Sequence, residues 1–143
     1  MQVYNKGQII FVRLYPNEDI ISSLIKTCEQ YDLPSAILLS GIGQIKRVTL
    51  GYFKEKNNYT PETFNGPFEL LSLNGTLIQH NSTYKAHLHV VISDEDKQVR
   101  GGHLIGGSVE VTNEIVLLSI KASLQRQYNK ETGLFDLILP NDI

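Results

Sequence analysis

The chain has 143 residues, of which 41% are hydrophobic and 20% charged, a balance that excludes a disordered or fibrous protein. Its 13 basic and 15 acidic side chains give a formal charge of −2 and form no block of like charge, whereas a protein that binds the DNA backbone by itself usually carries a basic stripe. Because Met1–Lys6 begins no apolar leader and no run approaches about 18 apolar residues, we expect one soluble, cytoplasmic domain over residues 1–143 that does not enter a membrane.

The first predicted elements are a strand and a helix. Gln8–Tyr15 alternates apolar and polar residues and predicts a strand, which Pro16 and Asn17 end, with Asn17 as a helix N-cap. Apolar residues then recur at helical spacing and predict one amphipathic helix over Glu18–Tyr31. Cys28, the single cysteine, falls on its apolar face, so we expect a buried, inert thiol and neither a disulfide nor a thiolate metal cluster within one chain.

The middle of the chain predicts two strands and a long loop. Ser35–Leu39 is a short apolar run that ends at Gly41-Ile42-Gly43, where the glycines permit a tight turn. A second strand follows over Ile45–Phe53. The polar stretch Lys54–Pro67 is rich in Asn and Pro and predicts the longest loop of the protein.

The remaining segments predict a sheet. Strand-like runs follow one another at short intervals, namely Phe68–Leu73, Thr76–His80, Tyr84–Ser93, Gly107–Val111 and Glu114–Leu124. Short connections of this kind favour antiparallel pairing, and Gly75 marks a bulge or a point of close approach. The apolar segment Leu134–Leu139 predicts a last strand, packed on the core or on a neighbouring subunit. The expected fold class is therefore α+β, a mainly antiparallel sheet with one or two packed helices.

Three histidines are spaced so that they can share one metal ion. His87 and His89 lie two positions apart in a predicted strand, so both project from the same face, about 6 to 7 Å apart. A turn at Asp94–Lys97 returns the chain, and Gly101-Gly102 leaves the backbone room to aim the His103 ring toward them. Three imidazoles with an open fourth position suit Zn²⁺, although ligand type alone also admits Ni²⁺, Fe²⁺ or Mn²⁺. A water on such a metal is acidified and serves as base or nucleophile.

Other interpretations of these polar residues stay open. The histidine pair is also compatible with a plain polar outer face of a strand, with His103 an unrelated loop residue. His80 has no spacing relation to the other three, and we expect it at the surface. Glu69 lies at the start of an apolar strand, where it serves either as a proton shuttle beside the metal or as a structural cap or ion-pair partner.

Three segments resemble the plants and prokaryotes conserved (PPC, or DUF296) domain family in their order and intervals. They are Gly66–Gly75, His87–Val90, and Gly101–Leu104 leading to Glu114–Val116. In plant members the first motif reads Gly-Arg-Phe-Glu-Ile-Leu, so Phe68 and Glu69 match it, whereas Pro67 stands at the arginine position. The resemblance extends over nearly the whole chain and implies a compact domain that assembles as a homotrimer.

The same resemblance implies several functions. DNA binding is attributed chiefly to plant members with a separate AT-hook, and these 143 residues contain no Arg-Gly-Arg-Pro element to enter a minor groove. The fold is also similar to that of acetolactate decarboxylases, which hold Zn²⁺ through a His-x-His pair and a later histidine. We therefore expect a metal-binding trimer with a DNA-binding role by resemblance. The alternatives are a metal-dependent lyase or hydrolase on a small oxygen-rich substrate, with Glu69 as acid/base, and a ligand-sensing or scaffolding trimer with a structural metal.

Overall fold

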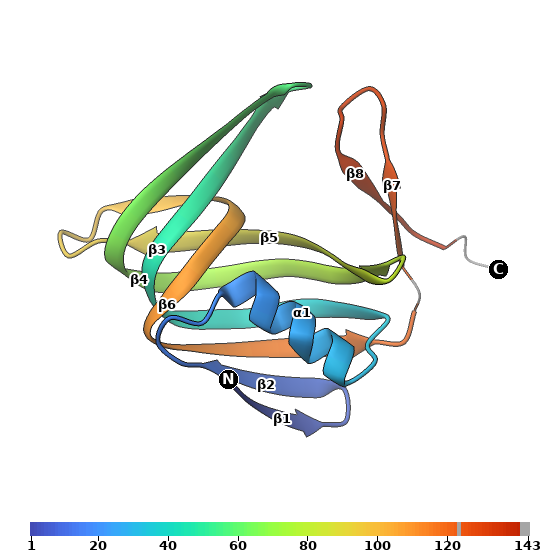
Figure 1. Ribbon diagram of the computed structural model, residues 1–143, viewed down its shortest axis with the longest axis horizontal. Helices are drawn as coiled ribbons and strands as arrows, with labels where there is room; N and C mark the ends of the chain where they lie inside the picture. The colour runs from blue at the N-terminus through green and yellow to red at the C-terminus, as the bar shows by residue number, and fades with distance from the viewer. Residues whose placement is uncertain (123, 141–143) are drawn as a thin grey trace.

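The structure consists mainly of long antiparallel strands (Figure 1). The computed structural model describes residues 1–122 and 124–140. In chain order its elements are β1 (Gln2–Lys6), β2 (Ile9–Leu14), α1 (Ile20–Gln30), β3 (Ser35–Glu55), β4 (Asn58–His80), β5 (Thr83–Ser93), β6 (Val99–Ile120), β7 (Gln125–Tyr128) and β8 (Phe135–Ile138). The predicted α+β class with a mainly antiparallel sheet is confirmed, with one helix in this part of the chain.

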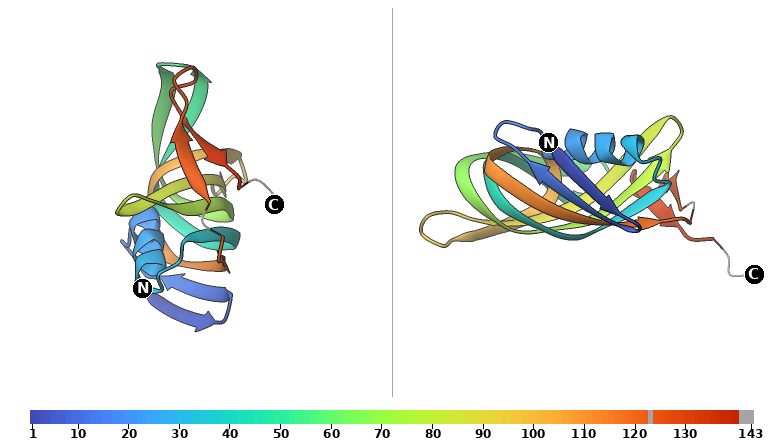
Figure 2. Two further views of the ribbon diagram at one scale, coloured as in Figure 1. Left: turned by 90° about the vertical axis from the view of Figure 1, so that its right-hand side faces the viewer. Right: turned by 90° about the horizontal axis from the view of Figure 1, so that it is seen from below.

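Six strands form one sheet in the order β1-β2-β6-β3-β4-β5, and β5 also pairs with β6, so the sheet curls back on itself (Figure 2). The helix packs against the side of this sheet that carries the buried core residues. Fully buried side chains such as Leu14, Leu24, Leu73, Leu88 and Ile115 come from both the helix and the strands. Because burying one such side chain contributes about 1.5–3 kcal/mol, the face that carries them sets the register of each strand.

The tight turn predicted at Gly41-Ile42-Gly43 is wrong, because β3 runs straight through these residues. The ladder with β6 instead shifts register on both sides of Gly43. Gly43 has a φ of +143°, and a Cβ there would lie 2.1 Å from the carbonyl oxygen of Thr112. The glycine thus permits a close approach of two strands, a use that the sequence pattern does not distinguish from a turn.

The long loop predicted over Lys54–Pro67 is also wrong. Glu55 pairs with Asn58, so only Lys56 and Asn57 form the connection, and the rest extends the hairpin of β3 and β4. This hairpin projects from the sheet as an arm (Figure 1). Most of its residues are exposed. A two-stranded arm with no buried face has no alternation of apolar and polar residues, which is why the sequence resembles a loop.

The helix is confirmed with a different start. Asp19, not Asn17, is the N-cap, and its side chain accepts a hydrogen bond of 2.8 Å from the backbone N–H of Ser22. Cys28 is fully buried as expected, and burial raises the pKa of its thiol to about 12, so the thiol stays protonated and inert. Within the described residues, no helix has the length and apolar character needed to cross a membrane.

The ends of the chain form strands that the pattern misses or misplaces. β1 was not predicted, although it pairs with β2 along its full length. Of the apolar segment Leu134–Leu139, only Phe135–Ile138 forms a strand, and its partner is β7 rather than a strand of the core. The apolar side chains of this segment are 38% to 64% exposed. Packing on the core is therefore wrong, and packing on a neighbouring subunit stays a prediction.

Gly75 is a point of close approach between β4 and β5, as predicted. Its φ is +141°, and a Cβ there would lie 2.0 Å from the carbonyl oxygen of His87. We expect Gly75→Ala to lower the free energy of unfolding by about 1–3 kcal/mol or more. The cost of placing alanine at this φ and the cost of its clash with the carbonyl oxygen of His87 add to each other.

The matched control is Gly106→Ala, since a Cβ at Gly106 meets nothing within 4 Å. Its effect should stay within about 0.5 kcal/mol. Urea unfolding of both variants, compared with the wild type at one protein concentration, measures the difference. Equal free energies for the two variants would contradict the assigned contact.

Candidate metal centre

Strand pairing brings the three predicted histidines together. His87 and His89 both lie in β5 and are exposed, while Leu88 between them is 1% exposed and belongs to the core. The first part of β6 returns beside β5 and places His103 directly opposite His89. The turn between these strands is held by Asp94, whose carboxylate accepts hydrogen bonds from the backbone N–H of Gln98 and the side chain of Arg100.

The spacing of the three imidazoles suits a metal ion. One ring nitrogen of each of His87, His89 and His103 lies within 4.8 Å of the other two. The Nε2 atoms of His87 and His89 are 3.3 Å apart. Two nitrogen ligands on a tetrahedral zinc ion with bonds of 2.0–2.1 Å are separated by about 3.3–3.4 Å. The pair therefore already has the spacing of two ligands, and one ring nitrogen of His103 lies within 4.8 Å of both.

The electrostatic surroundings favour neutral imidazoles. Burial lowers the pKa of His87, and the neighbouring Arg126 and His89 lower it further. Burial also lowers the pKa of His103, with smaller contributions from the two other rings. Neutral imidazole is the form that binds a metal. In the described part of the chain, no Asp, Glu or Cys joins the cluster, so its ligand set is all nitrogen.

Arg126 contacts the cluster, and sequence reasoning missed it. Its Nη2 atom lies 3.4 Å from Nδ1 of His87 and donates to Oγ1 of Thr76 at 3.0 Å. Because a guanidinium only donates hydrogen bonds, Nδ1 of His87 accepts here. The proton of neutral His87 then lies on Nε2, which faces Nε2 of His89. No local motif could have indicated this contact, since 39 residues separate Arg126 from His87.

Tyr59 is a second residue that sequence reasoning missed, because it falls in the predicted loop. Its ring meets the His103 ring edge to face, with 6.1 Å between centroids. The Tyr59 hydroxyl lies over Gly51, and a Cβ at Gly51 would be 2.1 Å from the hydroxyl oxygen. Gly51 is the residue of β3 that pairs with His103 of β6. Burial raises the pKa of Tyr59, so its hydroxyl remains a hydrogen-bond donor at neutral pH.

The two other residues singled out from the sequence lie elsewhere in the chain. Glu69 pairs with Ser93 in the ladder and accepts a hydrogen bond of 3.0 Å from Gln44. Ser93 lies four positions along β5 from His89, roughly 13 Å at strand rise. Within one chain Glu69 is therefore outside the cluster, and its acid/base role stays a prediction. His80 is also outside the cluster, and it is half-buried against Phe135 rather than fully exposed.

Comparison with known sequences identifies one family over most of the chain. The Plants and Prokaryotes Conserved (PCC) domain matches residues 1–121. The chain is also 30% identical over 128 residues to the bifunctional protein GlmU from Synechococcus sp. (strain JA-3-3Ab) and to the GlmU of strain JA-2-3B'a(2-13). These alignments cover 88% of this chain but only 20% and 19% of the two relatives. The chain thus spans about a fifth of the length of the curated relatives it matches.

Solved structures share the whole fold. A candidate DNA-binding protein from Bacteroides thetaiotaomicron has a TM-score of 0.90 at 25% identity, with 96% of each chain covered. A plant- and prokaryote-conserved (PPC) protein from Pyrococcus horikoshii has a TM-score of 0.84 at 26% sequence identity, with 98% of this chain and 95% of that chain covered. A metal-containing protein from Archaeoglobus fulgidus has a TM-score of 0.82 at 27% sequence identity, with 97% of this chain and 100% of that chain covered.

A more distant likeness bears on the fold alone. A Staphylococcus aureus protein similar to alpha-acetolactate decarboxylase has a TM-score of 0.55 at 12% identity, covering 82% of this chain and 54% of its own. The predicted similarity in fold is confirmed at this level.

The lowered pKa values of His87 and His103 predict how the metal-free protein responds to pH. An NMR titration should give midpoints for both rings below the ordinary histidine value of about 6.5. Because the unfolded chain binds these protons more readily, the stability present above about pH 6.5 is lost as the pH falls further. Urea unfolding at pH 7 and pH 5 should show this loss, and the double variant His87→Gln/His103→Gln should reduce it. Midpoints at or above the ordinary value would contradict the assignment.

Proposed function

The chain belongs to the Plants and Prokaryotes Conserved (PCC) domain family, and we propose that it is a homotrimer that binds one divalent metal ion per chain through His87, His89 and His103. The observation that carries the proposal is the 3.3 Å separation of the Nε2 atoms of His87 and His89, the spacing of two nitrogen ligands on zinc. The all-nitrogen ligand set also suits zinc. Similarity to the metal-containing protein from Archaeoglobus fulgidus supports the same assignment.

The cluster leaves room for a ligand on the metal. Three histidines converge, and no fourth ligating side chain of the described residues joins them. Structural zinc sites are closed by four protein ligands, whereas catalytic sites keep one position for water or substrate. Three ligands therefore favour a site that binds a small molecule over a purely structural metal. A metal in it would supply a Lewis acid and an acidified water, the chemistry that a lyase or hydrolase needs.

The homotrimer is supported by an apolar area on the sheet as well as by the family. Tyr4, Phe11 and Ile42 are 61%, 49% and 51% exposed and line one groove on β1, β2, β3 and β6. We call this groove the apolar face. Contiguous exposed apolar surface of this kind marks an interaction site. A second copy of the chain would cover it, and closed symmetry favours such self-association.

DNA binding is a second candidate function. It is favoured by the similarity to the candidate DNA-binding protein from Bacteroides thetaiotaomicron. The charge opposes it, because a net charge of −2 without a basic block supplies little attraction for phosphates. We therefore place metal-dependent ligand binding first.

The proposed trimer predicts a mass near three times 16.1 kDa in light scattering at micromolar concentration. Phe11→Asp should shift the protein toward the monomer, because it places a charge on the apolar face. Val99→Asp is the control, since Val99 is 61% exposed and lies outside that face, at the start of β6. A monomeric wild type would contradict the proposal.

The proposed metal site predicts a simple pattern of occupancy. After reconstitution with Zn²⁺, metal analysis should find one ion per wild-type chain, with occupancy falling below about pH 6 as protons compete for the rings. His89→Ala should weaken binding by more than about 100-fold, because it removes a direct ligand. Its circular dichroism should not change, since His89 is on the face opposite the core.

His80→Ala is the matched control and should keep full occupancy, because His80 lies outside the cluster. Equal occupancy in His89→Ala and the wild type would contradict the assignment. So would a wild type that stays empty with Zn²⁺, Ni²⁺, Fe²⁺ and Mn²⁺, and the polar strand face would then be the better interpretation.

A further inference from the structure

The two nitrogens of the His87 ring face two different groups. Nδ1 lies 3.4 Å from Nη2 of Arg126, and Nε2 lies 3.3 Å from Nε2 of His89. Because a guanidinium only donates hydrogen bonds, Nδ1 accepts from Arg126, and the single proton of the neutral ring lies on Nε2. His87 therefore donates this proton to Nε2 of His89. We call these two hydrogen bonds, from Arg126 to His87 and from His87 to His89, the relay.

The guanidinium of Arg126 is held beside His87 from two sides. Its Nη2 also donates to Oγ1 of Thr76 at 3.0 Å, and its Nη1 donates to the carbonyl oxygen of Phe135 at 3.1 Å. Thr76 of β4 is the direct neighbour of His87 across the ladder with β5. Burial lowers the pKa of Arg126 and the Asp136 carboxylate raises it, but a guanidinium stays protonated at physiological pH. Arg126 is therefore a charged donor aimed at Nδ1 of His87.

The hairpin of β7 and β8 has other anchors besides this contact. The Phe135 ring lies 4.3 Å from the ammonium group of Lys85 and 5.6 Å from the centre of the His80 ring. At the tip, the ammonium group of Lys56 in the arm donates a hydrogen bond to the carbonyl oxygen of Lys130. Figure 1 shows the tips of the arm and the hairpin side by side, and the left view of Figure 2 agrees. The hairpin can therefore stay on the sheet when the Arg126 side chain moves.

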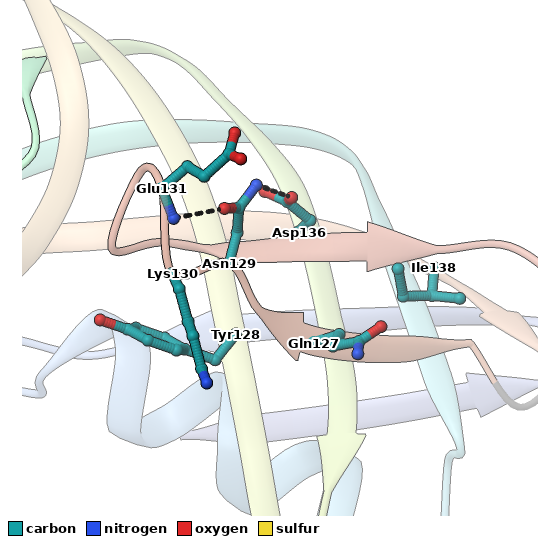
Figure 3. Close-up of a pocket in the computed structure, with 7 residues that line it drawn as sticks. All are labelled: Gln127, Tyr128, Asn129, Lys130, Glu131, Asp136 and Ile138. Carbon is teal, nitrogen blue, oxygen red and sulfur yellow. Dashed lines mark hydrogen bonds between the residues drawn. The ribbon is translucent and has the colours of Figure 1, made fainter.

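The turn of the hairpin is also organised from within (Figure 3). The Asn129 side chain accepts a hydrogen bond of 2.8 Å from the backbone N–H of Glu131 and donates one of 2.8 Å to the Asp136 carboxylate. An open pocket at this turn is lined by hairpin residues and does not include the histidines. The turn thus keeps its shape without help from the cluster, and the hairpin acts on the cluster through Arg126.

The contact of Arg126 with His87 is incomplete in a way that favours its release. Nε of Arg126 is buried and has no hydrogen-bond partner among the described residues. A buried N–H without a partner is unfavourable, and water would satisfy it once the side chain moved outward. The position beside His87 is therefore one of two that the arginine side chain can take.

A metal ion on His87 requires the opposite arrangement of the ring proton. A metal bound at Nε2 uses the lone pair of that nitrogen, so the proton of the neutral ring must lie on Nδ1. Two N–H donors, Nδ1 of His87 and Nη2 of Arg126, would then face each other across 3.4 Å. The hydrogen bond from His87 to His89 would be lost as well. Arg126 thus helps to keep His87 neutral, but it fixes the proton on the nitrogen that the metal needs.

We propose that Arg126 opposes metal binding, because the relay closes the metal-free cluster and a metal ion binds as the Arg126 side chain leaves Nδ1 of His87. This inference rests on the proposed metal site. Such coupling is reciprocal, so the metal weakens the contact of Arg126 with His87 by the factor by which that contact weakens the metal. Arg126 lies beyond residues 1–121, where the family match ends, so the C-terminal hairpin regulates a site that the family domain builds.

The first test is a competition titration of Zn²⁺ between the protein and a chelating dye. Arg126→Met keeps the length of the side chain and removes its charge and its donors. This variant should bind Zn²⁺ about tenfold more tightly than the wild type or better, because a hydrogen bond from a charged group no longer has to be broken. Arg126→Lys keeps a charged donor and should bind Zn²⁺ less tightly than Arg126→Met.

The second test uses the wild type alone and does not depend on a variant. Nitrogen-15 NMR of the imidazole rings distinguishes a proton on Nδ1 from one on Nε2. His87 should carry its proton on Nε2 in the metal-free protein and on Nδ1 after Zn²⁺ is added, and the Nε–H signal of Arg126 should shift at the same time. A proton on Nδ1 of His87 in the metal-free protein would overturn the relay.

The control variant is Arg100→Met, which removes a positive charge three residues from His103. Arg100 pairs with Asp94 at 2.8 Å, and Asp94 keeps its hydrogen bond from the backbone of Gln98 in the variant. Arg100→Met should therefore bind Zn²⁺ as tightly as the wild type. Equal or weaker Zn²⁺ affinity in Arg126→Met than in the wild type would overturn this inference alone. If neither protein binds Zn²⁺, the metal site is overturned together with it.

Discussion

The pairing of β5 with the first part of β6 is the contact on which the rest of the site depends. It closes the curled sheet, and it places His103 opposite His89. A register slip of one residue would turn the histidines toward the core and expose Leu88 and Val90, which are both 1% exposed. The hydrophobic effect therefore holds the polar cluster in position from the other side of the strand.

The same constraint explains why close approaches between strands surround the cluster. Gly75 brings β4 against the backbone of His87, and Gly51 admits the Tyr59 hydroxyl beside the strand of His103. Both positions exclude a Cβ, because the space is filled by main chain or by an aromatic side chain. The buried side chains on the core side of the sheet fix the direction in which the histidine rings point. The glycines at positions 75 and 51 fix how closely β4 and the Tyr59 side chain approach the strands that carry these rings.

Two kinds of structure therefore contribute to the candidate site. The closed sheet supplies the three nitrogens within the region that the family shares, residues 1–121. The C-terminal hairpin adds a guanidinium that lies against His87 and opposes its protonation.

The sequence by itself determined the helix, the strands and the shared face of His87 and His89, because each depends on a local period, while His103 followed from the turn predicted at Asp94–Lys97. Residues two apart on a strand share a face whatever the rest of the chain does, so His87 and His89 were paired correctly. Only the tertiary structure decided that the segment Lys54–Pro67 is part of an arm and that Gly43 lies inside a strand. It also decided that Arg126 meets the triad. These features arise from contacts between segments far apart in the chain, and an exposed arm or a lone arginine carries no periodic pattern from which such contacts could be predicted.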